Sequence, residues 1–194
     1  MAISKNLALR RFVPSVAKFT YNPVFAALLS IPDVVPGIFF REFRKLPPNR
    51  MRVRVGVSNR IFANQVMYLL RGYPLWMYAL SKGYVNFGSS IVEVGCGIGR
   101  RTHVIRDFHF HDVRFTGKYL GIDIDPKMIE WCRANFDERF EFALSSHASE
   151  AYLNTTAKKD SYYAIPRVDT TVDFENSTSL LTHLLAPEAR KYFT

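Results

Sequence analysis

A glycine-rich segment near the middle of the 194-residue chain has the residue types and spacing of a ligand-binding turn. Residues 91–94, Ile-Val-Glu-Val, form a largely β-branched run that favours a buried strand. Gly95, Gly97 and Gly99 follow it at every second position. Glycine adopts positive φ and lets another molecule approach the backbone closely. A strand, a tight turn and a helix start therefore predict a nucleotide-type crevice at the carboxyl end of a parallel sheet.

The spacing of these glycines argues against a dinucleotide. The dinucleotide fingerprint is G-x-G-x-x-G, and its third glycine would fall on Arg100. The chain instead has G-x-G-x-G, with Glu93 two residues before the first glycine. A nicotinamide-dependent oxidoreductase is thus the weaker interpretation. Cys96 lies inside the turn, and we interpret it as a small packing residue rather than a nucleophile.

Asp123 is a second candidate ligand-binding residue, one βα unit further along the chain. It ends the apolar segment 119–122, and Pro126 follows where the first turn of a helix accepts proline. Asp125 is the expected N-cap of that helix. A carboxylate at the end of a second strand can accept hydrogen bonds from the two hydroxyls of a ribose. The alternative is that Asp123 is an ordinary turn residue. Together with the glycine turn, however, an aspartate at this position predicts an adenosine-binding crevice.

The elements that must position these residues alternate between strand and helix. The expected ranges are strands at 91–94, 119–123 and 140–144, crossover helices at 101–110 and 127–136, and a fourth strand opening at 172–174. This order predicts an α/β fold, a Rossmann-like doubly wound parallel sheet. Strand one would be central, with strands two and three on one side and strand four on the other. His109 and His111 would point apart on a helix, so we predict no metal site.

These segments resemble class I S-adenosylmethionine-dependent methyltransferases, in particular a small bacterial-type group. The resembling residues are Val92–Arg100, Gly121–Asp125 and Ser179–Leu184, the last similar to the group's serine-x-x-threonine-histidine-leucine motif after strand four. The resemblance runs from about Arg52 to the C-terminus and implies S-adenosyl-L-methionine as the cofactor. That fold has seven strands, and only strands one to four find sequence here, so we expect a chain that is truncated at its C-terminus.

The resemblance also implies roles for individual residues. Asp123 would hold the ribose hydroxyls and Ile124 would contact the adenine, whereas Glu93 would organise the turn's N–H groups or the cofactor's ammonium. The end of strand three, where members carry an acid or another polar group, has Ser146 followed by His147. The implied cofactor-binding residues are Glu93, Gly95, Cys96, Gly97, Gly99, Arg100, Asp123, Ile124, Ser146 and His147.

The activity implied by the resemblance is methyl transfer to an oxygen or nitrogen of a small molecule or glycan. His183 is the candidate general base, and a helix-start histidine bonded to the backbone is the alternative. A chain that binds the cofactor without catalysis is the second interpretation. Strand four would be an open edge with uncovered leucines, so we expect aggregation or self-association through it.

The net charge of +9 comes from the first sixty residues. They contain eleven of the 26 Lys and Arg residues but two of the 17 Asp and Glu residues. We therefore divide the chain into a basic, partly helical N-terminal extension, residues 1–57, and an incomplete methyltransferase domain, residues 58–194. The extension would face an anionic substrate, an anionic membrane surface (through residues 1–60) or solvent alone, and nucleic acid is disfavoured.

The number of cysteines and the apolar segments indicate where in the cell the protein is expected. Cys96 and Cys132 show neither a disulfide framework nor metal-ligand spacing, so we expect a reducing, cytoplasmic environment. Residues 1–22 contain no acid, a composition shared by interfacial helices and organellar transit peptides, which leaves a peripheral-membrane or organellar location as alternatives. The most apolar run, Val24–Phe40, is interrupted by prolines, which predict bends around a short helix rather than a transmembrane span.

Overall fold

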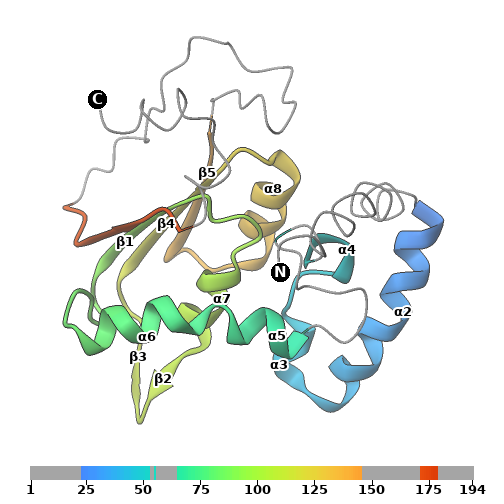
Figure 1. Ribbon diagram of the computed structural model, residues 1–194, viewed down its shortest axis with the longest axis horizontal. Coiled ribbons are helices and arrows are strands. Elements are labelled where there is room, and N and C mark those ends of the chain that lie inside the picture. Colours follow the sequence, from blue (N-terminus) through green and yellow to red (C-terminus); the bar gives the residue numbers. More distant parts are fainter. Residues whose placement is uncertain (1–22, 53–54, 56–64, 146–170, 179–194) are drawn as a thin grey trace, which may run out of the picture. The chain divides into compact units, whose positions relative to one another are not determined.

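The structure of the protein is a computed structural model that describes residues 23–52, 55, 65–145 and 171–178. The chain divides into two compact units, Met1–Tyr68 and Leu69–Thr194 (Figure 1). The described part of the first unit is helical. The second unit contains a parallel sheet with helices, so the predicted α/β class is confirmed.

A four-stranded parallel sheet forms the centre of the second unit. Its strands are β1 (Ser90–Val94), β4 (Lys118–Asp123), β5 (Phe140–Leu144) and β6 (Phe174–Asn176). They lie in the order β5-β4-β1-β6, so β1 is central as predicted. The register places Glu93 of β1 beside Gly121 of β4 and Asn176 of β6. Because all four strands are parallel, their carboxyl ends meet at one edge of the sheet (Figure 1).

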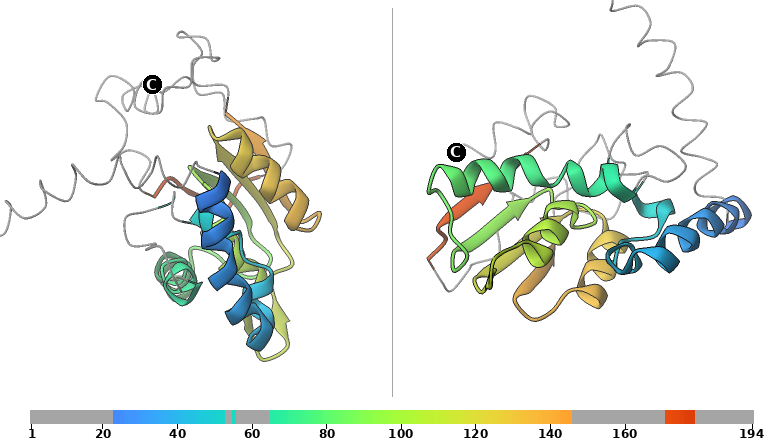
Figure 2. Two further views of the ribbon diagram at one scale, coloured as in Figure 1. Left: turned by 90° about the vertical axis from the view of Figure 1, so that its right-hand side faces the viewer. Right: turned by 90° about the horizontal axis from the view of Figure 1, so that it is seen from below.

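Two crossover helices lie on one face of this sheet. They are α7 (Arg100–Asp107), between β1 and β4, and α8 (Pro126–Asn135), between β4 and β5. Both connections step along the sheet in the same direction, and right-handed crossovers then place both helices on the same face, as Figure 2 shows. Apolar side chains on their inner faces are buried, namely Val104, Ile105, Met128, Ile129 and Cys132. These side chains form the core between the two helices and the sheet.

The helix ends follow local residue chemistry. Asp125 Oδ1 accepts hydrogen bonds from the backbone N–H groups of Lys127 at 3.0 Å and Met128 at 3.3 Å, which confirms the predicted N-cap of α8. Helix α6 (Tyr73–Ser81) accepts Pro74 in its first turn. It is followed by Gly83 with a φ of 69°, a conformation that favours glycine after a helix.

The first crossover helix is shorter than predicted. It ends at Asp107, after which β2 (His109–Phe110) pairs antiparallel with β3 (Val113–Arg114). Phe108 has extended backbone angles, and its ring stacks on Phe87 with centroids 5.9 Å apart. This contact, with a residue far away in the sequence, takes Phe108 out of the helix. His109 therefore lies on a strand and not on the helix that we expected.

The N-terminal unit contains a longer helix than the prolines predicted. Its helices are α2 (Pro23–Phe39), α3 (Arg41–Arg44) and α4 (Asn49–Arg52), with α5 (Gln65–Leu70) at the boundary of the two units. The predicted bends were wrong, because α2 runs through Pro32 and Pro36. A proline in a helix interior removes one backbone hydrogen bond, yet the backbone stays helical across both positions. None of the helices in the described ranges has both the length and the apolar character required to cross a membrane.

The end of α2 is fixed by a side chain from the next helix. Arg44 Nε donates to the carbonyl of Gly37 at 2.5 Å, and Arg44 Nη2 donates to that of Ile38 at 3.1 Å. The last carbonyls of a helix have no partner within the helix. Arg44 supplies these partners and holds α3 against the end of α2.

We predict that Gly117→Ala lowers the free energy of unfolding by about 2–3 kcal/mol, because the added methyl group overpacks the junction with β1. A Cβ at Gly117 would lie 2.1 Å from the carbonyl oxygen of Ser89, so the backbone must move. The matched control is Gly88→Ala, whose Cβ would lie 3.4 Å from its nearest neighbour, Asn86 Oδ1. Urea denaturation measures both variants, and equal losses would contradict this account of the junction.

Candidate functional site

The glycine turn joins β1 to α7, and its shape requires glycine. Gly95, Gly97 and Gly99 have φ values of 81°, 57° and 71°, in the left-handed region that side chains disfavour. The N–H groups of Gly95 and Cys96 donate to the carbonyl of Ile122 on β4, at 2.7 and 3.1 Å. The backbone of the turn is therefore tied to the neighbouring strand. A bulky substitution here strains the fold as well as any binding site, so it cannot test ligand binding alone.

Asp123 lies against this turn. Its Oδ2 accepts a hydrogen bond from the N–H of Gly97 at 2.7 Å, and its Oδ1 accepts one from the N–H of Asp125 at 3.0 Å. The structure thus brings together the two motifs that the sequence singled out, although they are 26 residues apart. Each carboxylate oxygen can accept more than one hydrogen bond, so the group retains acceptor capacity for a ligand.

Burial raises the pKa of Asp123 above its ordinary value, and the hydrogen bonds from the N–H groups of Asp125 and Gly97 lower it only in part. The ionised carboxylate is therefore short of stabilising partners. A pair of hydroxyl donors would supply them. This is the chemistry of a ribose diol, so the residues present fit an adenosine-containing ligand.

Glu93, on the central strand, is 1% exposed and fully engaged with neighbouring side chains. Its Oε1 accepts a hydrogen bond from Arg101 Nη1 at 2.5 Å, and its Oε2 accepts one from the Tyr119 hydroxyl at 2.5 Å. The Tyr119 oxygen in turn accepts a hydrogen bond from Thr102 Oγ1 at 2.9 Å. The Glu93 network, defined as Glu93, Arg101, Thr102 and Tyr119, therefore joins β1, β4 and α7.

The side-chain partners of Glu93 differ from those that the sequence suggested. The sequence suggested either the turn's N–H groups or a ligand's ammonium, whereas the hydrogen bonds shown run to Arg101 and Tyr119. Burial, followed by the negative charge of Glu93, raises the pKa of Tyr119, which keeps its phenol protonated as a donor. The ion pair with Arg101 compensates the buried charge of Glu93. Glu93 thus acts on the turn through the start of α7.

Cys96 packs inside the turn, as the sequence indicated. Its thiol is buried, and a Cβ at Gly121 would lie 2.9 Å from its Sγ. Burial, and next the charge of Asp123, raises the pKa of Cys96 well above its ordinary value, which keeps the thiol protonated. Gly121 is thus required for close packing under the turn. Sequence reasoning missed this role, although a glycine in the middle of a strand is a signal for close approach.

Asn176 is a further polar residue at this edge that sequence reasoning missed. It ends β6 beside Glu93, and its Oδ1 is buried without a hydrogen-bond partner in the part of the chain that the structure describes. Buried amide oxygens usually have a partner. An amide at the carboxyl end of the fourth strand was a detectable signal, because ligands of open α/β sheets bind at that edge.

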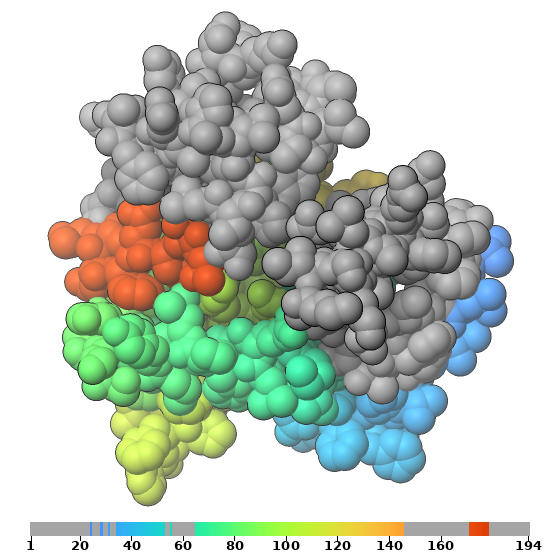
Figure 3. Space-filling model, viewed as in Figure 1, coloured from blue at the N-terminus to red at the C-terminus, as the bar shows by residue number. Residues whose placement is uncertain are grey.

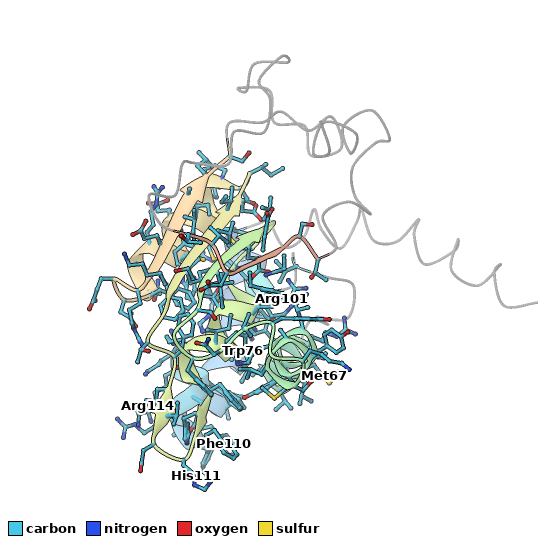
Figure 4. The ribbon with its side chains drawn as sticks, turned by 90° about the vertical axis from the view of Figure 1, so that its left-hand side faces the viewer. Met67, Trp76, Arg101, Phe110, His111 and Arg114 are labelled. Carbon is cyan, nitrogen blue, oxygen red and sulfur yellow. The ribbon has the colours of Figure 1, made fainter. Side chains whose placement is uncertain are left out.

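Of the remaining predicted site residues, two lie next to the turn and Asp123, and three lie outside the described ranges. Arg100 is the first residue of α7, and Ile124 directly follows Asp123. Ser146, His147 and His183 lie outside the described residues. His111 lies at the tip of the β2–β3 hairpin with Phe110 and Arg114, far from Arg101 (Figure 4). Within the described ranges, no group of three or more metal-binding side chains comes together.

We predict that Tyr119→Phe lowers the free energy of unfolding by about 1.5–3 kcal/mol, because the buried Glu93 carboxylate loses a donor. The matched control is Tyr84→Phe, since Tyr84 is 56% exposed. Urea denaturation monitored by circular dichroism measures both losses. If the two variants lose the same stability, the network does not contribute as described.

Two comparisons with known proteins bear on this site. A family model described as a methyltransferase domain matches residues 92–194, more than half of the chain. The chain is also similar to the carboxy-S-adenosyl-L-methionine synthase of Hahella chejuensis (strain KCTC 2396), with 27% identity over 82 residues. That similarity covers 40% of this chain and 33% of the relative, so the chain matches about a third of that protein's length. Because the family match begins within β1 and includes both the glycine turn and Asp123, the chain belongs to the class I S-adenosyl-L-methionine-dependent methyltransferases.

Proposed function

We propose that the chain binds S-adenosyl-L-methionine at the carboxyl edge of β1, β4 and β6 and methylates an oxygen or nitrogen of a small molecule or glycan. Family membership supports the cofactor and the reaction class, and the name of the similar synthase also contains S-adenosyl-L-methionine. The cofactor supplies a methyl group made electrophilic by its sulfonium sulfur. The observation that carries the proposal is the Asp123 carboxylate held against Gly97.

Asp123 is proposed to accept the two ribose hydroxyls. The N–H groups of Gly97 and Asp125 hold its carboxylate in one orientation before any ligand arrives. A preorganised acceptor loses little freedom on binding, which favours affinity. The same N–H of Gly97 ties the carboxylate to the glycine turn, along which the methionine portion would lie. Ile124 keeps its proposed contact with the adenine.

Glu93 is proposed as a positioning residue rather than a direct contact. Its bond to Arg101 fixes the second residue of α7, directly after the turn. Fixing the geometry of the two reactants is the main task in methyl transfer, since alignment alone can remove about 7–11 kcal/mol of a barrier. The adenine contacts of Ser146 and His147 and the general-base role of His183 remain sequence-based proposals.

Asn176 supports a polar methyl acceptor. Its buried Oδ1 lies at the same edge as Asp123 and is free to accept a hydrogen bond, within the part of the chain described. Hydroxyl and amino groups, the targets of O- and N-methylation, can donate one. A small molecule or glycan carries such groups. Release of S-adenosylhomocysteine in the presence of hydroxylated or amino acceptors tests this part of the proposal.

We predict that Asp123→Asn weakens the binding of S-adenosylhomocysteine by about 1.5–3 kcal/mol, because hydrogen bonds to a charged acceptor are lost. Isothermal titration calorimetry measures the affinity. The matched control is Asp125→Asn, which removes a charge two residues away while asparagine retains the N-cap of α8. The control should bind like the unmodified chain.

The same titrations distinguish the alternative functions. Binding of NAD but not of S-adenosylhomocysteine would indicate a nicotinamide-dependent enzyme and contradict the proposal. Binding of S-adenosylhomocysteine without turnover of any acceptor would indicate a chain that binds the cofactor without catalysis. Unchanged affinity in Asp123→Asn would remove Asp123 from the ribose role.

We also predict that the affinity for S-adenosylhomocysteine falls as the pH falls through the pKa of Asp123. Burial raises this pKa, so the free protein takes up the proton at a pH where an exposed aspartate is still ionised. The protonated carboxyl is a poorer acceptor for ribose hydroxyls, whereas the unliganded fold gains stability in acid from the same raised pKa. Titrations at successively lower pH, starting from neutral pH, should show this loss before an exposed aspartate would take up its proton. Asp123→Asn should lack it, and an equal pH dependence in that variant would assign the effect to another group.

A further inference from the structure

A stripe of apolar side chains runs along one side of α2. It consists of Val24, Leu28, Ile31, Val35, Ile38 and Phe39, and each side chain is between 52% and 75% exposed. From Val24 to Ile38 they are three or four residues apart, which places them on one face of a helix, and Phe39 lies at the edge of that face. Soluble proteins rarely expose contiguous apolar surface of this kind without a partner. We call this surface the α2 stripe.

Basic side chains follow the α2 stripe directly. Arg41, Arg44, Lys45 and Arg50 are exposed, and Glu42 is the single acid among residues 40–52. Arg44 is held at the end of α2 by its bonds to the carbonyls of Gly37 and Ile38. The basic cluster, defined as these four basic residues, is thus attached to one end of the stripe. In Figure 3 the described side chains of α2 are blue, and those of the residues that follow the helix are lighter blue.

We propose that the α2 stripe and the basic cluster together dock onto the surface of an anionic lipid bilayer. The helix would lie in the plane of the interface, about 25 Å long at 1.5 Å per residue, with its stripe about 5–10 Å deep. The basic side chains would meet the lipid phosphates, which attract cations close to the surface. A helix that lies on a membrane in this way need not be long enough to cross it.

The combination of features favours a bilayer over other partners. A second copy of this chain would bring the same surface, and residues 1–60 contain two acids against eleven basic residues, so it would not neutralise the basic cluster. Nucleic acid would neutralise the charges but would leave the stripe exposed to water. An anionic bilayer supplies an apolar interior and negative headgroups in the same place.

The proposal is tested by flotation of the whole chain with lipid vesicles. We expect binding to phosphatidylcholine vesicles that contain about 30% phosphatidylglycerol and much weaker binding to phosphatidylcholine alone. The binding should weaken as the salt rises from about 0.01 M to about 0.15 M, because the Debye length falls from about 30 Å to about 8 Å. Absence of binding to the anionic vesicles, or equal binding to both kinds, would overturn the proposal.

Two sets of substitutions separate the stripe from the charges. Leu28→Ser, Ile31→Ser and Ile38→Ser combined should lower partitioning into anionic vesicles at least about tenfold. Arg41→Gln, Lys45→Gln and Arg50→Gln combined should lower it by about fivefold for each charge removed. Arg44 is left unchanged because it holds the end of α2. All six positions are exposed, so the fold should persist, and circular dichroism checks this.

Matched controls come from the second unit. Phe110→Ser and Val113→Ser remove exposed apolar side chains of the hairpin, and Lys82→Gln, Lys118→Gln and Lys127→Gln remove three exposed charges. These variants should bind vesicles like the unmodified chain. Loss of binding in the charge variant but not in the stripe variant would indicate a polyanion and overturn the proposal. The proposal would also be overturned if the unmodified chain bound no vesicles and sedimented as a dimer, and if the stripe variant sedimented as a monomer.

Discussion

A buried carboxylate on the central strand is the constraint on which the second unit depends. Glu93 is 1% exposed, and removing a carboxylate from water is costly unless it is paired. Its partners come from β4 and from α7, so the sheet and the helix must assemble together to satisfy it. The network therefore stabilises one arrangement of three elements, and that arrangement fixes where the glycine turn lies.

The glycine turn and Asp123 depend on this arrangement and on each other. The N–H groups of Gly95 and Cys96 donate to the carbonyl of Ile122. The N–H of Gly97 donates to the carboxylate of Asp123, the next residue along β4. The hydrogen bonds that close the fold at this edge are thus the ones that orient Asp123 for a ligand. Folding therefore provides the preorganisation that a positioned cofactor requires, and the raised pKa of Asp123 reflects the remaining need for donors.

Charge and chemistry occupy different parts of the molecule. The excess of basic residues lies within the first sixty positions, whereas the glycine turn, Asp123 and the Glu93–Arg101 ion pair lie in the second unit. The proposed bilayer contact and the proposed cofactor site therefore use residues from different units of the chain.

Local patterns in the sequence were sufficient for the order of the elements and for part of the site. The β-branched strand, the alternating glycines, the N-cap at Asp125 and the central position of β1 all follow from short-range chemistry and from the rules of parallel sheets. Tertiary structure decided the rest. The stacking of Phe108 on Phe87 ended α7 early, and α2 continues as a helix through Pro32 and Pro36. The partners of Glu93 likewise meet it only in the folded chain, so no local pattern could indicate them. A glycine within a strand and an amide at a strand end did mark Gly121 and Asn176, but only the folded chain decided which residues lie against them.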